Sequence, residues 1–194
     1  MPRLDVCVLV MLLPGQAALG QTAQDASGGI GRALEMPAHR ALIDRIAGDG
    51  AGLAPFETDG CSGGLSEVWR LVSAQLPDFA AAHDDAPPWE ACCVTHDRAY
   101  HGIAGAQDAA TSFDARLQAD ADLRSCVVQT GESRKARLAA HYDVDVATVE
   151  QAYEIIAESM YLAVRFGGGP CSGLPWRWGY GWPHCSILQR GGAE

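Results

Sequence analysis

The sequence has no useful length of alternating apolar and polar residues, and this absence argues against a protein built on β-sheets. It also has no internal repeats and no sign of a second domain, so residues 36–194 are predicted to form a single domain. A positive charge excess is missing as well. The chain has 14 Lys and Arg against 24 Asp and Glu, which gives a net charge of −10. This charge excludes a nucleic-acid binder and disfavours binding to strongly anionic bilayers.

Long apolar runs are absent too. The longest segment near the start, Val6 to Leu13, is eight residues and cannot span about 30 Å of hydrocarbon. It follows Arg3 and precedes small residues at Ala18 and Gly20, the pattern of a secretory signal peptide over residues 1–20. We therefore expect a secreted or periplasmic protein without a transmembrane segment, and a flexible leader over residues 21–35.

Cleavage after Gly20 would remove Cys7 and leave six cysteines: Cys61, Cys92, Cys93, Cys126, Cys171 and Cys185. An even number in an exported chain predicts disulfides, up to three here. A zinc site made by Cys92, Cys93 and His96 is the alternative. It is disfavoured because adjacent cysteines rarely reach one metal and an exported chain favours oxidised thiols.

Apolar spacing and helix-ending glycines predict an all-α fold with little or no β-sheet. The expected helices cover residues 36–47, 66–76, 89–101, 107–128, 132–140 and 146–166. Residues 171–185 form a Gly- and Pro-rich loop whose aromatic residues are Trp176, Trp178, Tyr180 and Trp182. This loop is either an aromatic plug over the core or a surface that enters a lipid interface.

The segment with the most chemical information is Cys92-Cys93-Val94-Thr95-His96-Asp97-Arg98-Ala99-Tyr100. His96 and Tyr100 are four residues apart and share one face of the expected helix. Asp97 points about 100° round the helix from His96. The imidazole and the neighbouring carboxylate are therefore expected to serve different partners.

A second helix supplies a partner for the imidazole if Cys92 bridges to Cys126. At 1.5 Å per residue, His96 then lies about 6 Å along one helix and Asp120 about 9 Å back along the other. A carboxylate at Asp120 can accept an N–H from the ring, which is the orienting half of a catalytic dyad. Asp122 is the competing residue, but it is rotated by about 200° from Asp120.

These residues resemble the secreted phospholipase A2 superfamily over about residues 58–128, through the motif Cys-Cys-x-x-His-Asp-x-x-Tyr and an Asp six residues before a Cys. The resemblance implies a disulfide-linked antiparallel helix pair with the bridges Cys92–Cys126, Cys61–Cys93 and Cys171–Cys185. Ala99 and Ala119 stand where most of the family has a further disulfide, and residues 65–88 are an insertion. The chain looks closer to the compact microbial types than to the animal enzymes.

The resemblance also implies a Gly-rich loop that binds Ca²⁺ through the backbone carbonyls of Gly60, Ser62 and Gly64, with the carboxylate of Asp97. Hard oxygen ligands and freely bending glycines suit that ion. The implied activity is calcium-dependent hydrolysis of the sn-2 ester of glycerophospholipids, with catalytic residues His96, Asp120 and Tyr100. The expected substrate is a phospholipid aggregate or membrane surface, and a monomer is expected.

Two other functions compete with this one. Residues 60–64 match G-x-S-x-G, the nucleophile elbow of serine hydrolases, but that elbow needs a strand before Ser62 and several strands in the fold. A non-catalytic phospholipase A2-like module that binds lipid or protein is the stronger rival. Such relatives usually lose the His or the Ca²⁺-binding Asp, whereas His96 and Asp97 are both present here.

Overall fold

The computed structural model describes residues 16–48, 50–61, 64–83 and 86–187. Its helices are α1 (Gln16–Ala47), α2 (Gly64–Gln75), α3 (Pro77–Ala82), α4 (Glu90–His101), the 3₁₀ turn η1 (Ile103–Gly105), α5 (Ala109–Tyr142) and α6 (Val146–Gly167). Within those described ranges there is no β-strand, and the predicted all-α fold is confirmed. Residues Met1–Leu34 and Glu35–Glu194 form two separate units, and the site described below belongs to the second.

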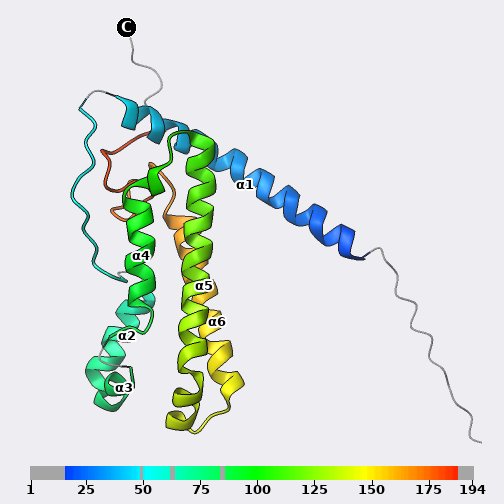
Figure 1. The fold of residues 1–194 in the computed structure, drawn as a ribbon, viewed down its shortest axis with the longest axis vertical. Coiled ribbons are helices and arrows are strands. Elements are labelled where there is room, and N and C mark those ends of the chain that lie inside the picture. Colours follow the sequence, from blue (N-terminus) through cyan, green and yellow to red (C-terminus); the bar gives the residue numbers. More distant parts are fainter. Residues whose placement is uncertain (1–15, 49, 62–63, 84–85, 188–194) are drawn as a thin grey trace, which may run out of the picture. The chain divides into compact units, whose positions relative to one another are not determined.

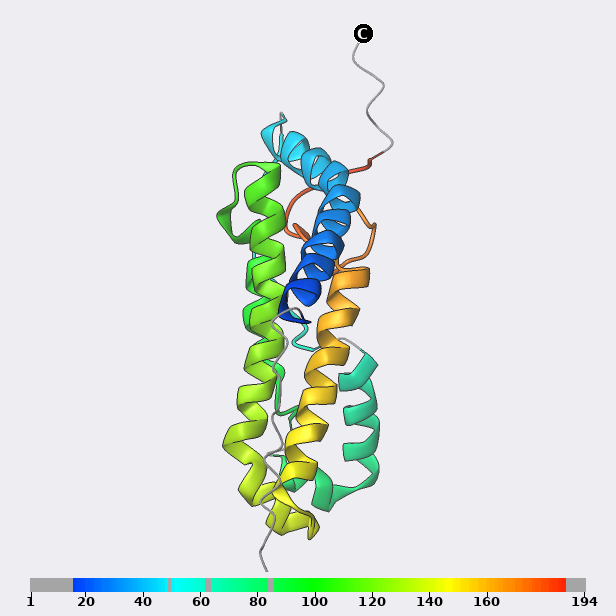
Figure 2. The same ribbon diagram turned by 90° about the vertical axis from the view of Figure 1, so that its right-hand side faces the viewer.

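Helices α4, α5 and α6 lie side by side and form the body of the second unit (Figures 1 and 2). Helix α5 runs antiparallel to both neighbours, and its contacts with α6 are the most extensive between any two elements. The apolar core between them includes Leu123 and Val127 of α5 and Tyr153 and Ala157 of α6, all almost completely buried. This packing fixes the two helices that carry the residues of the candidate site.

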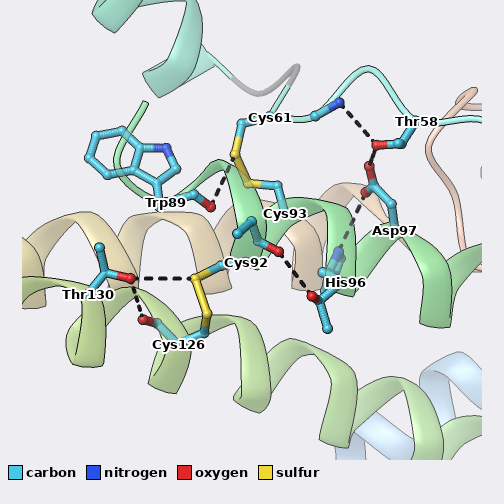
Figure 3. Close-up of a disulfide and its surroundings, with 12 residues drawn as sticks. Thr58, Cys61, Trp89, Cys92, Cys93, His96, Asp97, Cys126 and Thr130 are labelled. Carbon is cyan, nitrogen blue, oxygen red and sulfur yellow. Dashed lines mark hydrogen bonds and ion pairs between the residues drawn. A yellow bond between two sulfur atoms is a disulfide. The ribbon is translucent and has the colours of Figure 1, made fainter. Parts of the chain in front are cut away.

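Three disulfides connect this framework, and the pairing expected from the resemblance is confirmed. Cys92–Cys126 joins α4 to α5, with the two Cα atoms 5.8 Å apart. Cys61–Cys93 ties the loop before α2 to the same turn of α4, as Figure 3 shows. Cys171–Cys185 closes the aromatic loop that follows α6. The first two bridges lie within a turn of His96 along α4.

Helix α1 differs from the prediction of a flexible leader over residues 21–35 and a helix beginning at residue 36. The helix begins at Gln16 and continues through Pro37 to Ala47. Residues 16–35 contain five alanines but also four glycines, so helix preference alone does not explain this extension; the helix is nevertheless continuous through Glu35. Glu35 consequently sits within a helix. The predicted signal peptide lies mostly in residues 1–15, outside the described residues.

Helix α5 is also longer than predicted, since one continuous helix replaces the two expected at 107–128 and 132–140. The predicted gap over residues 129–131 includes Gly131, but this residue lies inside the helix and faces α6. A Cβ atom at Gly131 would come within 2.5 Å of the Tyr153 ring, so this glycine permits close helix packing. Tertiary contact has therefore overridden the weak helix preference of glycine.

The predicted loop over residues 77–88 contains the short helix α3, which begins with Pro77 at its first position. Proline is favoured there because its missing N–H would have had no helical partner. None of the described helices is both long and apolar enough to cross a bilayer.

Candidate active site

His96 lies in the middle of α4 with its side chain almost entirely buried. Its Nε2 atom is 2.9 Å from Oδ1 of Asp120 on α5. An ionised carboxylate can only accept a hydrogen bond, so Nε2 carries the proton in this pair. The other ring nitrogen, Nδ1, is thereby left as an acceptor in the neutral imidazole, which is the form a general base needs.

Asp120 is completely buried and its two oxygens receive several donors. The Tyr100 hydroxyl donates to Oδ1 at 2.7 Å, and Arg165 donates to Oδ2 at 2.9 Å. Burial alone would raise the pKa of Asp120, but the hydrogen bond from His96 and the charge of Arg116 hold that pKa below its usual range. The carboxylate is therefore ionised at neutral pH and holds the imidazole in one orientation.

The environment of His96 favours its protonated form. Burial lowers its pKa, yet the hydrogen bond to Asp120 and the negative charges of Asp120 and Asp97 outweigh that effect and raise the pKa above the ordinary histidine value. Nδ1 is 3.9 Å from Oδ1 of Asp97, as the dashed line between these residues in Figure 3 marks, whereas Nε2 is the nitrogen that contacts Asp120. A proton taken up at Nδ1 would thus be stabilised from both sides of the ring.

Two arginines and a glutamate complete the network, and none of the three was predicted as a site residue. Arg116 is fully buried, donates through Nε to the Tyr100 hydroxyl at 3.2 Å, and forms an ion pair with Glu35. Arg165 pairs with the same Glu35 as well as with Asp120. Arg116 stands one helical turn before Asp120, which is a signal readable from the sequence, whereas Glu35 and Arg165 come from distant helices.

Arg116 also donates hydrogen bonds to two backbone carbonyl oxygens at the end of α6. Its Nη2 donates to the carbonyl oxygens of Val164 and Arg165 at 2.8 and 2.9 Å. The Val164 carbonyl also accepts the backbone N–H of Gly168 at 2.8 Å, and the guanidinium adds a second donor to this helix end, so the contact anchors the end of α6 beside Asp120. The same guanidinium therefore positions both Tyr100 and Arg165.

The loop expected to bind calcium lies against α4. Thr58 donates its hydroxyl to Oδ2 of Asp97 at 2.6 Å and accepts the N–H of Gly60 at 3.0 Å (Figure 3). Gly60 has a φ of 72°, a conformation that favours glycine, and a Cβ there would lie 2.8 Å from Oε1 of Glu90, which would have to move. This brings the loop backbone close to the first turn of α4.

The structure describes the other predicted calcium ligands only in part. Gly64 is the first residue of α2, and Ser62 lies outside the described residues. Among the side chains that the structure describes, no three His, Cys, Asp or Glu converge on a possible metal position. The expected set has one carboxylate and three backbone carbonyls, and its hard oxygens are chemically suited to Ca²⁺.

The serine-hydrolase alternative lacks the strand that it requires. Residues 51–61, which precede Ser62, contain no regular secondary structure, although helix α2 does follow. A nucleophile elbow is a strand-to-helix turn. The described fold therefore offers Ser62 no such support.

The aromatic loop after α6 contributes both to the core and to the surface. Trp178 is completely buried, contacts Tyr100 edge to face at 5.0 Å between ring centres, and donates Nε1–H to Ser112 at 2.9 Å. The plug interpretation therefore applies to Trp178. Trp176, by contrast, exposes 40% of its surface.

Comparisons of the chain with models of protein families, with curated proteins and with solved structures find no match. The candidate site accordingly rests on its own geometry. His96, Tyr100 and Asp120 come together in one hydrogen-bonded group, while Asp97 faces the opposite side of the imidazole and the Gly60 loop. Asp122 points elsewhere and accepts a hydrogen bond from Gln118 on the exposed face of α5.

Proposed function

We propose that the protein is a calcium-dependent phospholipase A2 that hydrolyses the sn-2 ester of glycerophospholipids and releases a fatty acid and a lysophospholipid. The observation that carries the proposal is the buried pair of His96 and Asp120, in which Nε2–H is committed to the carboxylate and Nδ1 is left as a base. A histidine with only a structural role has no need of an ionised, fully buried carboxylate supported by Tyr100 and Arg165.

In the proposed reaction, Nδ1 of His96 removes a proton from a water molecule as that water attacks the ester carbonyl. Asp120 keeps the ring in the required tautomer and stabilises the imidazolium that forms. When the tetrahedral intermediate collapses, the ester C–O bond breaks and Nδ1 returns the proton to the leaving alkoxide. Water thus supplies the hydroxyl of the fatty acid and the proton of the lysophospholipid, and no acyl-enzyme forms.

Asp97 and the carbonyls of Gly60, Ser62 and Gly64 are the groups that would hold Ca²⁺ in this proposal. The bound ion would neutralise the substrate phosphate and the charge that develops on the carbonyl oxygen. Thr58 keeps the Asp97 carboxylate turned toward the loop, and the Cys61–Cys93 bridge holds that loop against α4. Thr58 thus orients the proposed carboxylate ligand, and the disulfide fixes the loop that carries the proposed carbonyl ligands.

The proposal is tested by incubating the purified protein with vesicles of a phospholipid that carries different acyl chains at sn-1 and sn-2. Mass spectrometry of the products should show release of the sn-2 acid in the presence of Ca²⁺ and none with excess chelator. Asp97→Asn should abolish the calcium response, whereas Asp122→Asn is the matched control and should keep it. Hydrolysis that continues unchanged in chelator would refute the calcium-dependent mechanism.

A further inference from the structure

A pocket of about 330 Å³ lies beside the candidate site and is separate from the His96–Asp120 pair. Its walls combine three carboxylates with two aromatic rings: Glu57, Asp59, Asp97, Trp176 and Tyr180. The acidic residues come from the loop before α2 and from α4, and the rings come from the loop after α6. The volume lies in the lower part of the range for small-molecule sites.

The aromatic wall is held in place by specific contacts. Trp176 packs its ring on Gly167, where an added Cβ would come within 2.2 Å of the indole. The Tyr180 hydroxyl donates to the carbonyl oxygen of Glu57 at 2.7 Å and so joins the two loops that form the pocket. The Cys171–Cys185 and Cys61–Cys93 bridges each close one of these loops. The pocket is therefore formed before any ligand binds.

Of the three carboxylates of the pocket, only Asp97 forms an ion pair among the described residues, with Nδ1 of His96 at 3.9 Å. Within the described ranges, neither Glu57 nor Asp59 forms an ion pair, and the Arg98 guanidinium instead stacks on Phe56 at 4.4 Å from the ring centre. Burial, together with the charges of Asp97, Asp59 and Glu57, raises the pKa of Tyr180 to about 12 although Arg98 opposes this effect. A cation is thus favoured here and an anion is disfavoured.

We propose that this pocket binds the quaternary ammonium group of a choline head group, which makes zwitterionic choline phospholipids the preferred substrate class. Aromatic faces combined with carboxylates recognise quaternary ammonium ions, whose methyl groups prevent direct coordination. Asp97 borders both the pocket and the proposed calcium position. In a choline lipid only a short carbon link joins the ammonium to the phosphate, so the two groups can occupy these neighbouring positions. The assignment of choline phospholipids as substrates rests on the proposed function, whereas the binding of an ammonium ion in this pocket does not.

Choline binding is measured directly by calorimetry and by the indole NMR signals in the wild type, because free choline has no ester bond and cannot turn over. Trp176→Ala and the double variant Glu57→Gln/Asp59→Asn should each weaken choline binding about fivefold to tenfold. The matched controls are Phe166→Ala, an aromatic residue that is 88% exposed outside the pocket, and Glu154→Gln on α6. Both controls should bind choline as the parent does.

The ligand control is 3,3-dimethylbutan-1-ol, which has the shape of choline without its charge. The inference requires clearly weaker binding of this alcohol. Equal binding of choline and the alcohol, or the same affinity in the pocket variants and the controls, would overturn it. Because Glu57 and Asp59 are exposed loop residues, their double variant remains informative even if Trp176→Ala fails to fold.

A second measurement separates this inference from the proposed function. With mixed micelles of choline and glycerol phospholipids, the wild type should favour the choline lipid, and Glu57→Gln/Asp59→Asn should lose that preference while it still hydrolyses the glycerol lipid. Choline binding without any lipid hydrolysis would refute the phospholipase proposal and leave the ammonium site intact. Hydrolysis with no head-group preference in the wild type would refute the assignment of the substrate class.

Discussion

At the scale of single residues, Gly168 determines where Tyr100 can lie. A Cβ atom at Gly168 would come within 2.7 Å of Cε1 and 2.8 Å of the hydroxyl oxygen of Tyr100. Gly168→Ala should displace this ring, destabilise the protein by about 1–3 kcal/mol and weaken the support of Asp120. The control is Gly169→Ala, because a Cβ at Gly169 meets nothing within 4 Å. Urea unfolding of the two variants measures the difference, and equal stabilities would contradict the packing argument.

Asp120 gives a prediction about acid stability. Burial opposes ionisation, but His96 and Arg116 lower the pKa of Asp120 in the folded state. A carboxyl group with a lowered folded pKa stabilises the protein above its unfolded pKa of about 4, and this contribution disappears as the pH falls. Wild type should therefore be more stable than Asp120→Asn near neutral pH, by about 3–5 kcal/mol.

The difference between the two proteins should shrink as the pH falls below about 4, because a protonated Asp120 resembles asparagine. Urea unfolding of both proteins over a pH series is the measurement. A difference that stays constant down to the lowest pH at which both proteins fold would show that Asp120 is not held ionised by its neighbours.

At the scale of secondary-structure elements, the contact between α5 and α6 depends on Gly131. Alanine is the better helix former by about 1 kcal/mol, so helix preference alone predicts that Gly131→Ala stabilises α5. The Cβ would nevertheless lie 2.5 Å from Cγ of Tyr153, and we expect a net loss of about 1–2 kcal/mol. In a Tyr153→Ala background the same change should become neutral or stabilising. A double-mutant cycle with no coupling would refute the close approach.

The elements that could be predicted from the sequence are those with local signals. Helices α4 and α6 begin and end within a residue of the prediction, because Pro87-Pro88, Gly102 and Gly167-Gly168-Gly169 mark their ends. Helix α5 was divided wrongly at Gly131, whose role is to fit Tyr153 of another helix. Helix α1 was predicted too short because residues 21–35 are mostly small and polar and include three glycines, and the ion pairs that Glu35 makes with α5 and α6 leave no signal in the local sequence.

The residues of the candidate site likewise divide into those with a local sequence signal and those without one. His96, Tyr100 and Asp120 could be placed together because the cysteine spacing sets the register of two helices. Arg165 is 45 residues from Asp120 and Glu35 is 130 residues from Arg165 along the chain, and no periodicity links positions so far apart. The acidic and aromatic pocket was not predicted either, because it forms only where two disulfide-closed loops meet.

At the scale of the whole molecule, calcium should stabilise the folded protein if the loop before α2 binds it. A ligand that binds only the native state raises the free energy of unfolding, by about 2.7 kcal/mol at a hundredfold excess over its Kd. Calcium should therefore raise the unfolding temperature of the wild type and have little effect on Asp97→Asn. Mg²⁺ should have a weaker effect, because it demands a tighter octahedral shell. An identical calcium response in Asp97→Asn would remove this carboxylate from the metal site.

In the proposed mechanism, His96 acts as the base in a calcium-dependent phospholipid hydrolysis. The most direct test is the rate of fatty-acid release from phosphatidylcholine vesicles with saturating Ca²⁺, compared between wild type, His96→Gln and Ser62→Ala. We expect His96→Gln to lower the rate by about two to four orders of magnitude while its fold is retained, and Ser62→Ala to keep most of the activity. Equal rates in wild type and His96→Gln would contradict the account, as would loss of turnover in Ser62→Ala alone.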